Sequence, residues 1–340
     1  MCTPDSPCNR SGKQTHAGEI MITRRNFLVA SAACAITPAA AQGYPDRPIR
    51  LIVPAAPGGP TDIPARLLSQ ILPKLGQPVV VENRAGAGGA IGARAVAGAA
   101  PDGYTLLVGN TSVLAVIPGV SASAGYDPAK NFAPVAKISE SYQILVVHPS
   151  TPWKSVKELV ADAKANPGKF NIAHTGQGGL PHLAAELFKA NAGVDLVGVP
   201  YKSGGEAVTA LLGAQVHCTF EAITILLPLI RDGKVRALGV TSRARTPLAA
   251  DLPTMIEAGV PDYEVTTFQG VVAPAGTPAA IVAKLNTAIN EGLGTPEMRE
   301  TITKLGGVTT LGSPEELGRF MAAQTAKWSN VAKKANIKVD

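Results

Sequence analysis

Four short segments of this 340-residue chain combine glycine with small hydroxyl or amide residues, and each follows a short apolar run. They are 56–62 (APGGPTD), 109–112 (GNTS), 174–182 (HTGQGGLPH) and 200–206 (PYKSGGE). Where such a loop opens a helix, free backbone N–H groups at the positive helix end favour carboxylate or phosphate. The four segments together predict a site for a small anionic molecule.

The first segment is the most constrained of the four. Pro57 and Pro60 carry no backbone N–H, so the available main-chain donors are chiefly Gly58, Gly59 and Thr61. We expect a stiff loop with few donors that ends a strand and begins a helix.

Other patterns do not combine into catalytic or metal-binding chemistry. The glycines of RAGAGGAIGA miss the G-x-G-x-x-G spacing of a dinucleotide site, because Ile91 stands in place of the third glycine. Ser203 is not part of a G-x-S-x-G elbow, and the four histidines beyond residue 41 form no H-E-x-x-H or close H-x-H pair. We therefore expect a binding protein with no catalytic residue, metal or cofactor.

Short β-type runs alternate with helical patterns over most of the chain, which favours parallel sheets covered by helices on both faces. Thr61 or Asp62 is expected to cap the first helix, and Gly213 to end the helix 206–212 in a left-handed conformation. The other expected helices are 156–165, 279–293, 296–305 and 314–335. The expected strands are 49–53, 79–82, 105–108, 144–147, 170–173, 196–199, 216–220 and 235–240, with a further short run at 265–273.

The bulk composition excludes several classes of protein. Hydrophobic residues make up 46% and charged residues 16% of the chain, which excludes disorder and favours buried parallel sheet. Aromatic residues make up only 4%, and the net charge of +6 comes without a run of basic residues. We therefore expect no nucleic-acid partner.

The N-terminal region has the layout of an export signal. Arg24 and Arg25 precede an apolar run at 27–36, and small residues follow it. The run is too short to span a bilayer as a permanent helix. The paired arginines resemble the twin-arginine export motif, which predicts a signal peptide at 21–41 and a periplasmic location. A general export signal that happens to carry paired arginines is the alternative.

Residues 1–20 have no place in such a signal, so we expect Met21 to be the true start and the preceding segment to be an over-extended reading frame. Cleavage after Ala41 leaves Cys218 as the single cysteine, so no internal disulfide can form. Cys218 lies in the apolar stretch 216–220, which predicts a buried, inert thiol.

Six ordered stretches of the chain resemble a known family. They are LIVPAAPGGPTDIPARLLS, LGQPVVVENRAGAGGAIGARAVAGAAPDGYTLL, VHPSTPWKSVKELVADAKANPGKFNIAHTGQGGLPHLAAELF, VPYKSGGEAVTALLGAQVHCTFE, GKVRALGVTSRARTPLAADLPTMIEAGVPDYEV and GVVAPAGTPAAIVAKLN. Together they resemble the extracytoplasmic solute receptors of tripartite tricarboxylate transporters, the Bug (TctC-like) family, over residues 44–340.

The resemblance implies a two-lobe α/β fold of the type II periplasmic-binding-protein kind, each lobe a mainly parallel sheet flanked by helices. Residues 44–143 and 268–340 are expected to form the first lobe and 144–267 the second, with the ligand cleft between them. A monomeric receptor would close on a dicarboxylate, tricarboxylate, acidic amino acid or aromatic acid and deliver it to two membrane subunits. A sensor that presents the ligand to a signalling kinase, and a periplasmic α/β enzyme, are the alternatives.

The loops and the resemblance together give the expected ligand contacts. The alternatives to a ligand contact are a helix cap for Asp62, a capping or solvent-exposed position for His182, and a surface hinge role for Glu221. Pro60 stands where the family commonly has serine, which removes a hydroxyl and an N–H donor and is expected to retune specificity. The expected contacts are Ala56, Gly58, Gly59, Thr61, Asp62, Thr111, Thr175, Gly176, Gly178, His182 and Glu221.

Overall fold

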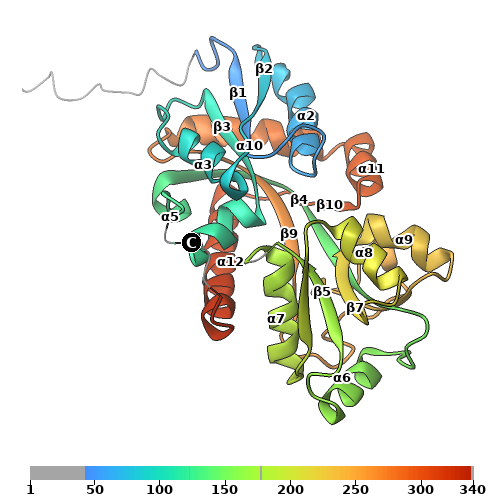
Figure 1. Ribbon diagram of the computed structural model, residues 1–340. Helices are drawn as coiled ribbons and strands as arrows, with labels where there is room; N and C mark the ends of the chain where they lie inside the picture. Colours follow the sequence, from blue (N-terminus) through green and yellow to red (C-terminus); the bar gives the residue numbers. More distant parts are fainter. Residues whose placement is uncertain (1–42, 122, 177, 338–340) are drawn as a thin grey trace, which may run out of the picture. The chain divides into compact units, whose positions relative to one another are not determined.

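The computed structural model describes residues 43–121, 123–176 and 178–337. The expected signal peptide at 21–41 and the expected extension at 1–20 lie outside these residues. The chain from Tyr44 onward forms one compact unit of strands and helices (Figure 1).

Among the described residues, ten strands form one mixed sheet in the order β2-β1-β3-β9-β4-β7-β5-β6, with β8 and β10 each paired to β4. Strands β1 to β3 are mutually parallel, as are β5 to β7, whereas β4 and β9 run antiparallel to their neighbours. The strands are β1 (Ile49–Val53), β2 (Val79–Asn83), β3 (Thr105–Asn110), β4 (Phe132–Val147), β5 (Asn171–Thr175), β6 (Val197–Tyr201), β7 (Cys218–Ala222), β8 (Arg236–Val240), β9 (Thr266–Pro274) and β10 (Gly307–Thr309).

Two lobes follow from this order. The first lobe is built on β1, β2 and β3, and the second on β5, β6 and β7, with β4 and β9 as the crossover strands between them. The predicted two-lobe α/β architecture is confirmed. Strand β1 shows why the parallel groups form, because every residue of Ile49–Val53 except Arg50 is buried.

Helices cover both lobes and largely match the sequence pattern. The hydroxyl of Ser155 accepts a hydrogen bond from the N–H of Glu158 and so caps α6, and Ser313 with Glu316 forms a capping box at the start of α12. The helices are α2 (Asp62–Ile71), α3 (Ala90–Ala97), α4 (Ile117–Val120), α5 (Pro128–Asn131), α6 (Val156–Ala165), α7 (Leu180–Ala192), α8 (Gly204–Leu212), α9 (Ile223–Arg231), α10 (Ala279–Leu293), α11 (Pro296–Lys304) and α12 (Pro314–Lys334), with short turns η2 (Leu72–Leu75), η3 (Ala87–Gly89), η4 (Ser112–Val116) and η5 (Pro247–Ala249).

The crossover strand β4 is longer than the sequence pattern indicates, whereas β9 is only shifted by one residue from the predicted run 265–273. The predicted strand 144–147 is only the last four of the 16 residues of β4, in the part that pairs with β7 and β8. The preceding part, Phe132–Tyr142, pairs with β9 and with β10, a three-residue strand absent from the predicted elements. The middle of β4 is polar and has no local strand pattern. It is a strand because it pairs with β9 and β10, which are distant in the sequence.

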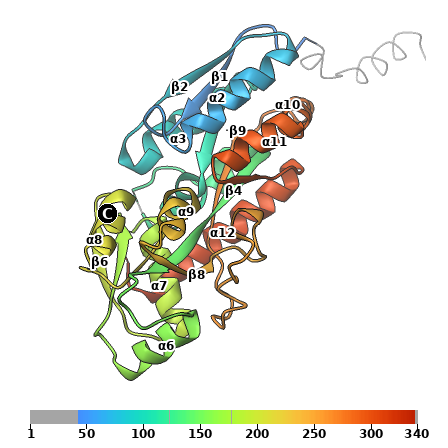
Figure 2. The same cartoon turned by 90° about the vertical axis from the view of Figure 1, so that its right-hand side faces the viewer.

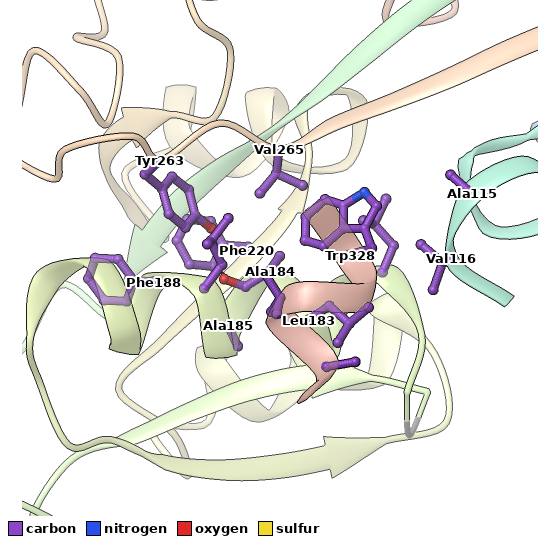
Figure 3. Packing of buried hydrophobic residues seen from close by; sticks show 14 of the residues in the cluster. Ala115, Val116, Leu183, Ala184, Ala185, Phe188, Phe220, Tyr263, Val265 and Trp328 are labelled. Atoms are coloured by element: carbon purple, nitrogen blue, oxygen red, sulfur yellow. The ribbon is translucent and has the colours of Figure 1, made fainter. Parts of the chain in front are cut away.

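The last helix, α12, packs against both lobes and joins their apolar residues into one core. Trp328 of α12 has no exposed surface, and Figure 3 shows it between Leu183 and Ala184 of α7 and Val116 of η4. The hydroxyl of Tyr263 donates to the backbone carbonyl of Ala184 at 3.1 Å. One apolar cluster therefore continues from the first lobe through α12 into the second.

The end of α8 corrects one prediction. Gly213 has φ −83°, so it is not left-handed, and the left-handed residue is Ala214 with φ +53°. The helix ends at Leu212 as predicted, but the left-handed residue comes one position later than expected, and the N–H of Gln215 then donates to the carbonyl of Ala210 at 2.9 Å.

Candidate functional site

The predicted anion-binding loops lie where parallel strands end. Loop 56–62 follows β1, 111–112 follows β3, 176–179 follows β5, and 202–203 follows β6. Because the carboxyl ends of parallel strands meet at one edge of a sheet, the loops of each lobe lie together.

The carboxylate of Asp62 organises the first loop from inside the protein. It has no exposed surface, and it accepts hydrogen bonds from Gly58 N–H at 2.8 Å, Arg66 Nε at 2.7 Å and Asn83 Nδ2 at 2.8 Å. Burial tends to raise the pKa of Asp62, but these donors hold the pKa below its ordinary value. The ionised side chain is thus occupied by three internal donors.

Side-chain capping of α2, expected from Thr61 or Asp62, does not occur. Thr61 holds the cap position, but its hydroxyl accepts from Asn110 Nδ2 at 2.9 Å instead. The carbonyl of Gly59 accepts from the N–H groups of Asp62 and Ile63 at 3.0 and 3.2 Å. Backbone geometry therefore closes the first turn of the helix.

These contacts reduce the number of donors that the loop can offer. Gly58 N–H is occupied by Asp62, whereas the N–H groups of Gly59 and Thr61 have no hydrogen-bonding partner among the described residues. Ala56 is exposed at the start of the loop. Within the loop these two N–H groups are therefore unpaired, and their contact with a ligand stays a prediction.

Thr111 lies at the end of β3 and is fully buried. Its hydroxyl donates to the carbonyl of Thr266 at 3.3 Å and accepts from the N–H of Phe268 at 2.7 Å. Thr111 therefore links the first lobe to the crossover strand β9, and a ligand would have to displace these bonds to reach the hydroxyl.

In the second lobe, a histidine holds the glycine loop. Gly176 and Gly178 have φ of +65° and +71°, and the N–H of Gly178 donates to Nδ1 of His182 at 3.1 Å. The ring of His182 stacks on that of His174, with centroids 4.2 Å apart and planes 14° apart. Thr175 is half-buried at the end of β5, next to this loop.

The stacked pair is held neutral. Burial, followed by the nearby His182, lowers the pKa of His174 to about 4. Burial also lowers the pKa of His182, with Glu186 opposing that shift and Lys189 adding to it. Because Nδ1 of His182 accepts a hydrogen bond, its proton resides on Nε2.

Glu221 lies at the end of β7, close to the start of two helices. Its carboxylate accepts from the N–H of Ala222 at 2.8 Å, and a Cβ added at Gly204 would lie 2.1 Å from its Oε2. Burial raises the pKa of Glu221, and the Ala222 bond partly opposes that shift. The carboxylate is packed against the first turn of α8.

Two pockets are lined by glycine-rich loops and by residues of both lobes. The crossover pocket, about 290 Å³, is lined by Gly58 and Pro60 of the first lobe, Ala222 of the second, and residues of β4 and β9. The glycine pocket, about 410 Å³, is lined by Gly88 and Ser112 of the first lobe and by residues 178–179 of the second. Of the predicted contacts, Gly58 lines the first pocket and Gly178 the second.

The remaining predicted contacts do not line either pocket. Asp62, Thr111 and His182 lie behind the loops and hold them through the bonds described above. Their contact with a ligand stays a prediction. The same holds for the other predicted contacts, which are the exposed or half-buried Ala56, Gly59, Thr175, Gly176 and Glu221 and the buried Thr61.

Sequence reasoning missed the lining residues of the crossover strands and of the loop after β2. Gly88, with φ +65°, belongs to the glycine-rich RAGAGGAIGA segment, which we considered only as a dinucleotide site and excluded. That segment's four glycines were the available signal. Ser141 and Gln269 lie in the middle of β4 and β9, and no local motif marks them.

Other features lie apart from these loops. A pocket of about 970 Å³ between α7 and α12 contains none of the predicted contacts.

Cys218 is 1% exposed, and burial raises its pKa to about 12, in line with the predicted unreactive thiol. In the described ranges, no three His, Cys, Asp or Glu side chains form a metal-binding group, and no helix combines the length and hydropathy needed to cross a bilayer.

Comparison with known proteins places this geometry among solute receptors. The profile of the family described as "Tripartite tricarboxylate transporter family receptor" matches residues 65–337. Protein BugT of Bordetella pertussis is 38% identical over 315 residues, which cover 92% of this chain and 96% of BugT.

Two solved structures with ligands are similar throughout. The Rhodopseudomonas palustris protein MatC with bound malate is 36% identical, with a TM-score of 0.69, over 85% of this chain and 99% of MatC. The R. palustris protein Rpa4515 with adipate is 37% identical, with a TM-score of 0.72, over 87% of this chain and 99% of that protein.

Proposed function

Since this chain belongs to the tripartite tricarboxylate transporter receptor family, we propose that it is a periplasmic receptor that captures a small carboxylate between its lobes. The observation that supports this most directly is that both lobes contribute loop glycines to shared pockets, Gly58 to one and Gly178 to the other. Similar proteins with adipate and malate support the carboxylate class.

Binding is proposed to close the lobes about β4 and β9. One moving body would consist of residues 44–143 and 268–340, and the other of residues 144–267. The boundaries between them lie inside β4 and β9, so these strands would act as the hinge. Main-chain N–H groups such as that of Gly59 would supply hydrogen bonds to the ligand carboxylate, which strengthen when the acceptor is ionised.

The loaded receptor is proposed to deliver its ligand to two membrane subunits, and the family description supports this partnership. Export by the twin-arginine route would place the receptor in the periplasm. We propose transport, not catalysis, as its role, because the related proteins are described as receptors.

The test is native mass spectrometry of the protein as purified, followed by thermal shift against dicarboxylates, tricarboxylates, amino acids and aromatic acids. A retained or stabilising carboxylate is the expected result, since a ligand at 100 times its Kd adds about 2.7 kcal/mol to the free energy of unfolding. Stabilisation by sugars or metals alone, with no response to any carboxylate, would refute the proposal.

A further inference from the structure

We propose that Asn110 is a positioning residue for the ligand: its amide holds the side chain of Thr61 so that Thr61 donates its hydroxyl proton, as well as its backbone N–H, to the ligand carboxylate. The inference rests on the proposed receptor function and specifies how the first loop holds the ligand. Asn110 is not among the contacts predicted from the sequence.

Asn110 links two segments of the first lobe through the two ends of its amide. It is the last residue of β3, and its Oδ1 accepts a hydrogen bond from the N–H of Val113 in η4 at 3.1 Å. Its Nδ2 donates to Oγ1 of Thr61 at 2.9 Å. Because the N–H of Val113 requires an acceptor, the oxygen of the amide must face Val113 and the nitrogen must face Thr61. The Thr61 hydroxyl oxygen is therefore the acceptor in its bond with Asn110.

This bond leaves the proton of the Thr61 hydroxyl free to be donated. A hydroxyl that accepts one hydrogen bond still has one proton to give, and among the described residues no atom accepts it. The backbone N–H of Thr61 also has no partner among these residues. Thr61 is only 2% exposed, so bulk water has little access to either donor. Because buried donors are nearly always paired in native proteins, a bound carboxylate would supply the missing acceptor.

The place of Thr61 in the fold suits a ligand held between the lobes. Pro60 lines the crossover pocket and Ser112 lines the glycine pocket, so the Thr61–Asn110 bond joins the loops that border both. Figure 2 shows α2, which follows Thr61, beside β1 and β2 in the first lobe. With the N–H of Gly59, the loop offers three neutral donors. Such donors can hold a carboxylate, because hydrogen bonds to an ionised acceptor are about twice as strong as neutral ones.

Substitutions at Thr61 test the hydroxyl by isothermal titration. The probe is whichever of malate, adipate, citrate, glutamate and benzoate binds the native protein most tightly. Thr61→Val removes the hydroxyl and keeps the backbone N–H, so binding is expected to weaken at least about fivefold. Thr61→Ser keeps the hydroxyl and should bind within about twofold of the native protein. The melting temperature of each unliganded variant checks folding.

Asn110→Asp tests the positioning role. It keeps Oδ1 as the acceptor for the N–H of Val113 but replaces the donor with a second acceptor, to which the Thr61 hydroxyl would turn its proton. Binding is expected to weaken at least about tenfold. The added negative charge also repels a carboxylate, so Asn110→Asp is repeated in the Thr61→Val variant, where only the charge can act. If Asn110 acts through the hydroxyl, the loss there is smaller than in the native chain.

The outcomes separate this inference from the receptor function. If Thr61→Val binds as tightly as Thr61→Ser, the hydroxyl donor is refuted, and equal losses from Asn110→Asp in both backgrounds refute the positioning role. Either result leaves the receptor function intact. If Asn110→Asp does not fold, the uncharged Asn110→Ser takes its place in both backgrounds, with the same criterion. If the native protein binds none of the five acids, the receptor proposal fails, and this inference fails with it.

Discussion

The backbone N–H of Gly58 donates to the carboxylate of Asp62 at 2.8 Å, so the first acid of α2 holds the loop that leads into it. The same carboxylate bonds Asn83 at the end of β2 and Arg66 one turn along α2. The loop is therefore held in shape by the protein itself. Such preorganisation lowers the ordering free energy that a ligand must overcome.

Replacing the acid should loosen this loop. Asp62→Asn is expected to lower the free energy of unfolding by about 2–3 kcal/mol, because a buried, charge-assisted set of hydrogen bonds loses its ionised acceptor. Urea denaturation at neutral pH measures the change. The control is Asp102→Asn, which breaks an exposed pair with Arg47 and should change stability by less than about 1 kcal/mol. Equal losses in both variants would contradict the network.

Low pH should protonate Asp62 and so remove its contribution to stability. The folded-state pKa of Asp62 lies below its ordinary value of 3.8, so its contribution to stability is present above pH 3.8. That contribution is lost as the pH falls through the lower, folded-state pKa. Urea titrations between pH 5 and pH 3 should therefore show a steeper loss in the native protein than in Asp62→Asn. Parallel curves would count against this assignment.

A side chain at Gly59 should block binding without unfolding the protein. A Cβ there meets only the carbonyl of Ala56 at 3.4 Å, so a side chain can begin at this position, and the branched side chain in Gly59→Val is expected to cover the free N–H of the loop. We expect a melting temperature close to that of the native protein and carboxylate affinity lower by more than about tenfold. Gly58→Ala is the contrast, because its φ of +78° should strain the backbone and lower stability by about 1–2 kcal/mol. Unchanged affinity in Gly59→Val would remove the loop from the site.

The stacked histidines should make the second lobe sensitive to acid. The folded-state pKa of His174, about 4, lies below the ordinary 6.5, so the unfolded chain takes up a proton first as the pH falls. Stability is thus complete above pH 6.5 and decreases between pH 6.5 and 4. His174→Asn should flatten this dependence in denaturation measured at pH 7.5 and 4.5. His148→Asn, on a more exposed ring, is the control, and an equal effect there would refute the role of burial.

The end of α8 offers a matched pair of substitutions. Ala214 is exposed and left-handed, so Ala214→Gly should raise the free energy of unfolding by about 0.5–1 kcal/mol. Gly213→Ala should be tolerated, since its φ is −83° and the nearest atom to an added Cβ is Thr209 O at 3.5 Å. Thermal unfolding of both variants checks this. If Gly213→Ala instead lowered the free energy of unfolding, the result would support a left-handed conformation at Gly213, as the sequence predicted.

The amino-acid sequence by itself determined the elements whose signals are local. Strand 49–53 and helices 156–165 and 279–293 have the predicted bounds, because apolar periodicity and capping residues act within one or two turns. The order of strands and helices also indicated parallel sheets covered by helices, the family resemblance implied the two lobes, and the glycine-rich loops marked the edge of each sheet.

Only the tertiary structure decided what each loop residue does. Asp62 bonds Asn83 across 21 positions and Thr111 bonds Phe268 across 157, so two residues predicted as ligand contacts also hold the backbone of the site. The lining residues Ser141 and Gln269 come together because β4 and β9 pair side by side. Pairing over such separations depends on packing of the whole chain, and no local pattern encodes it.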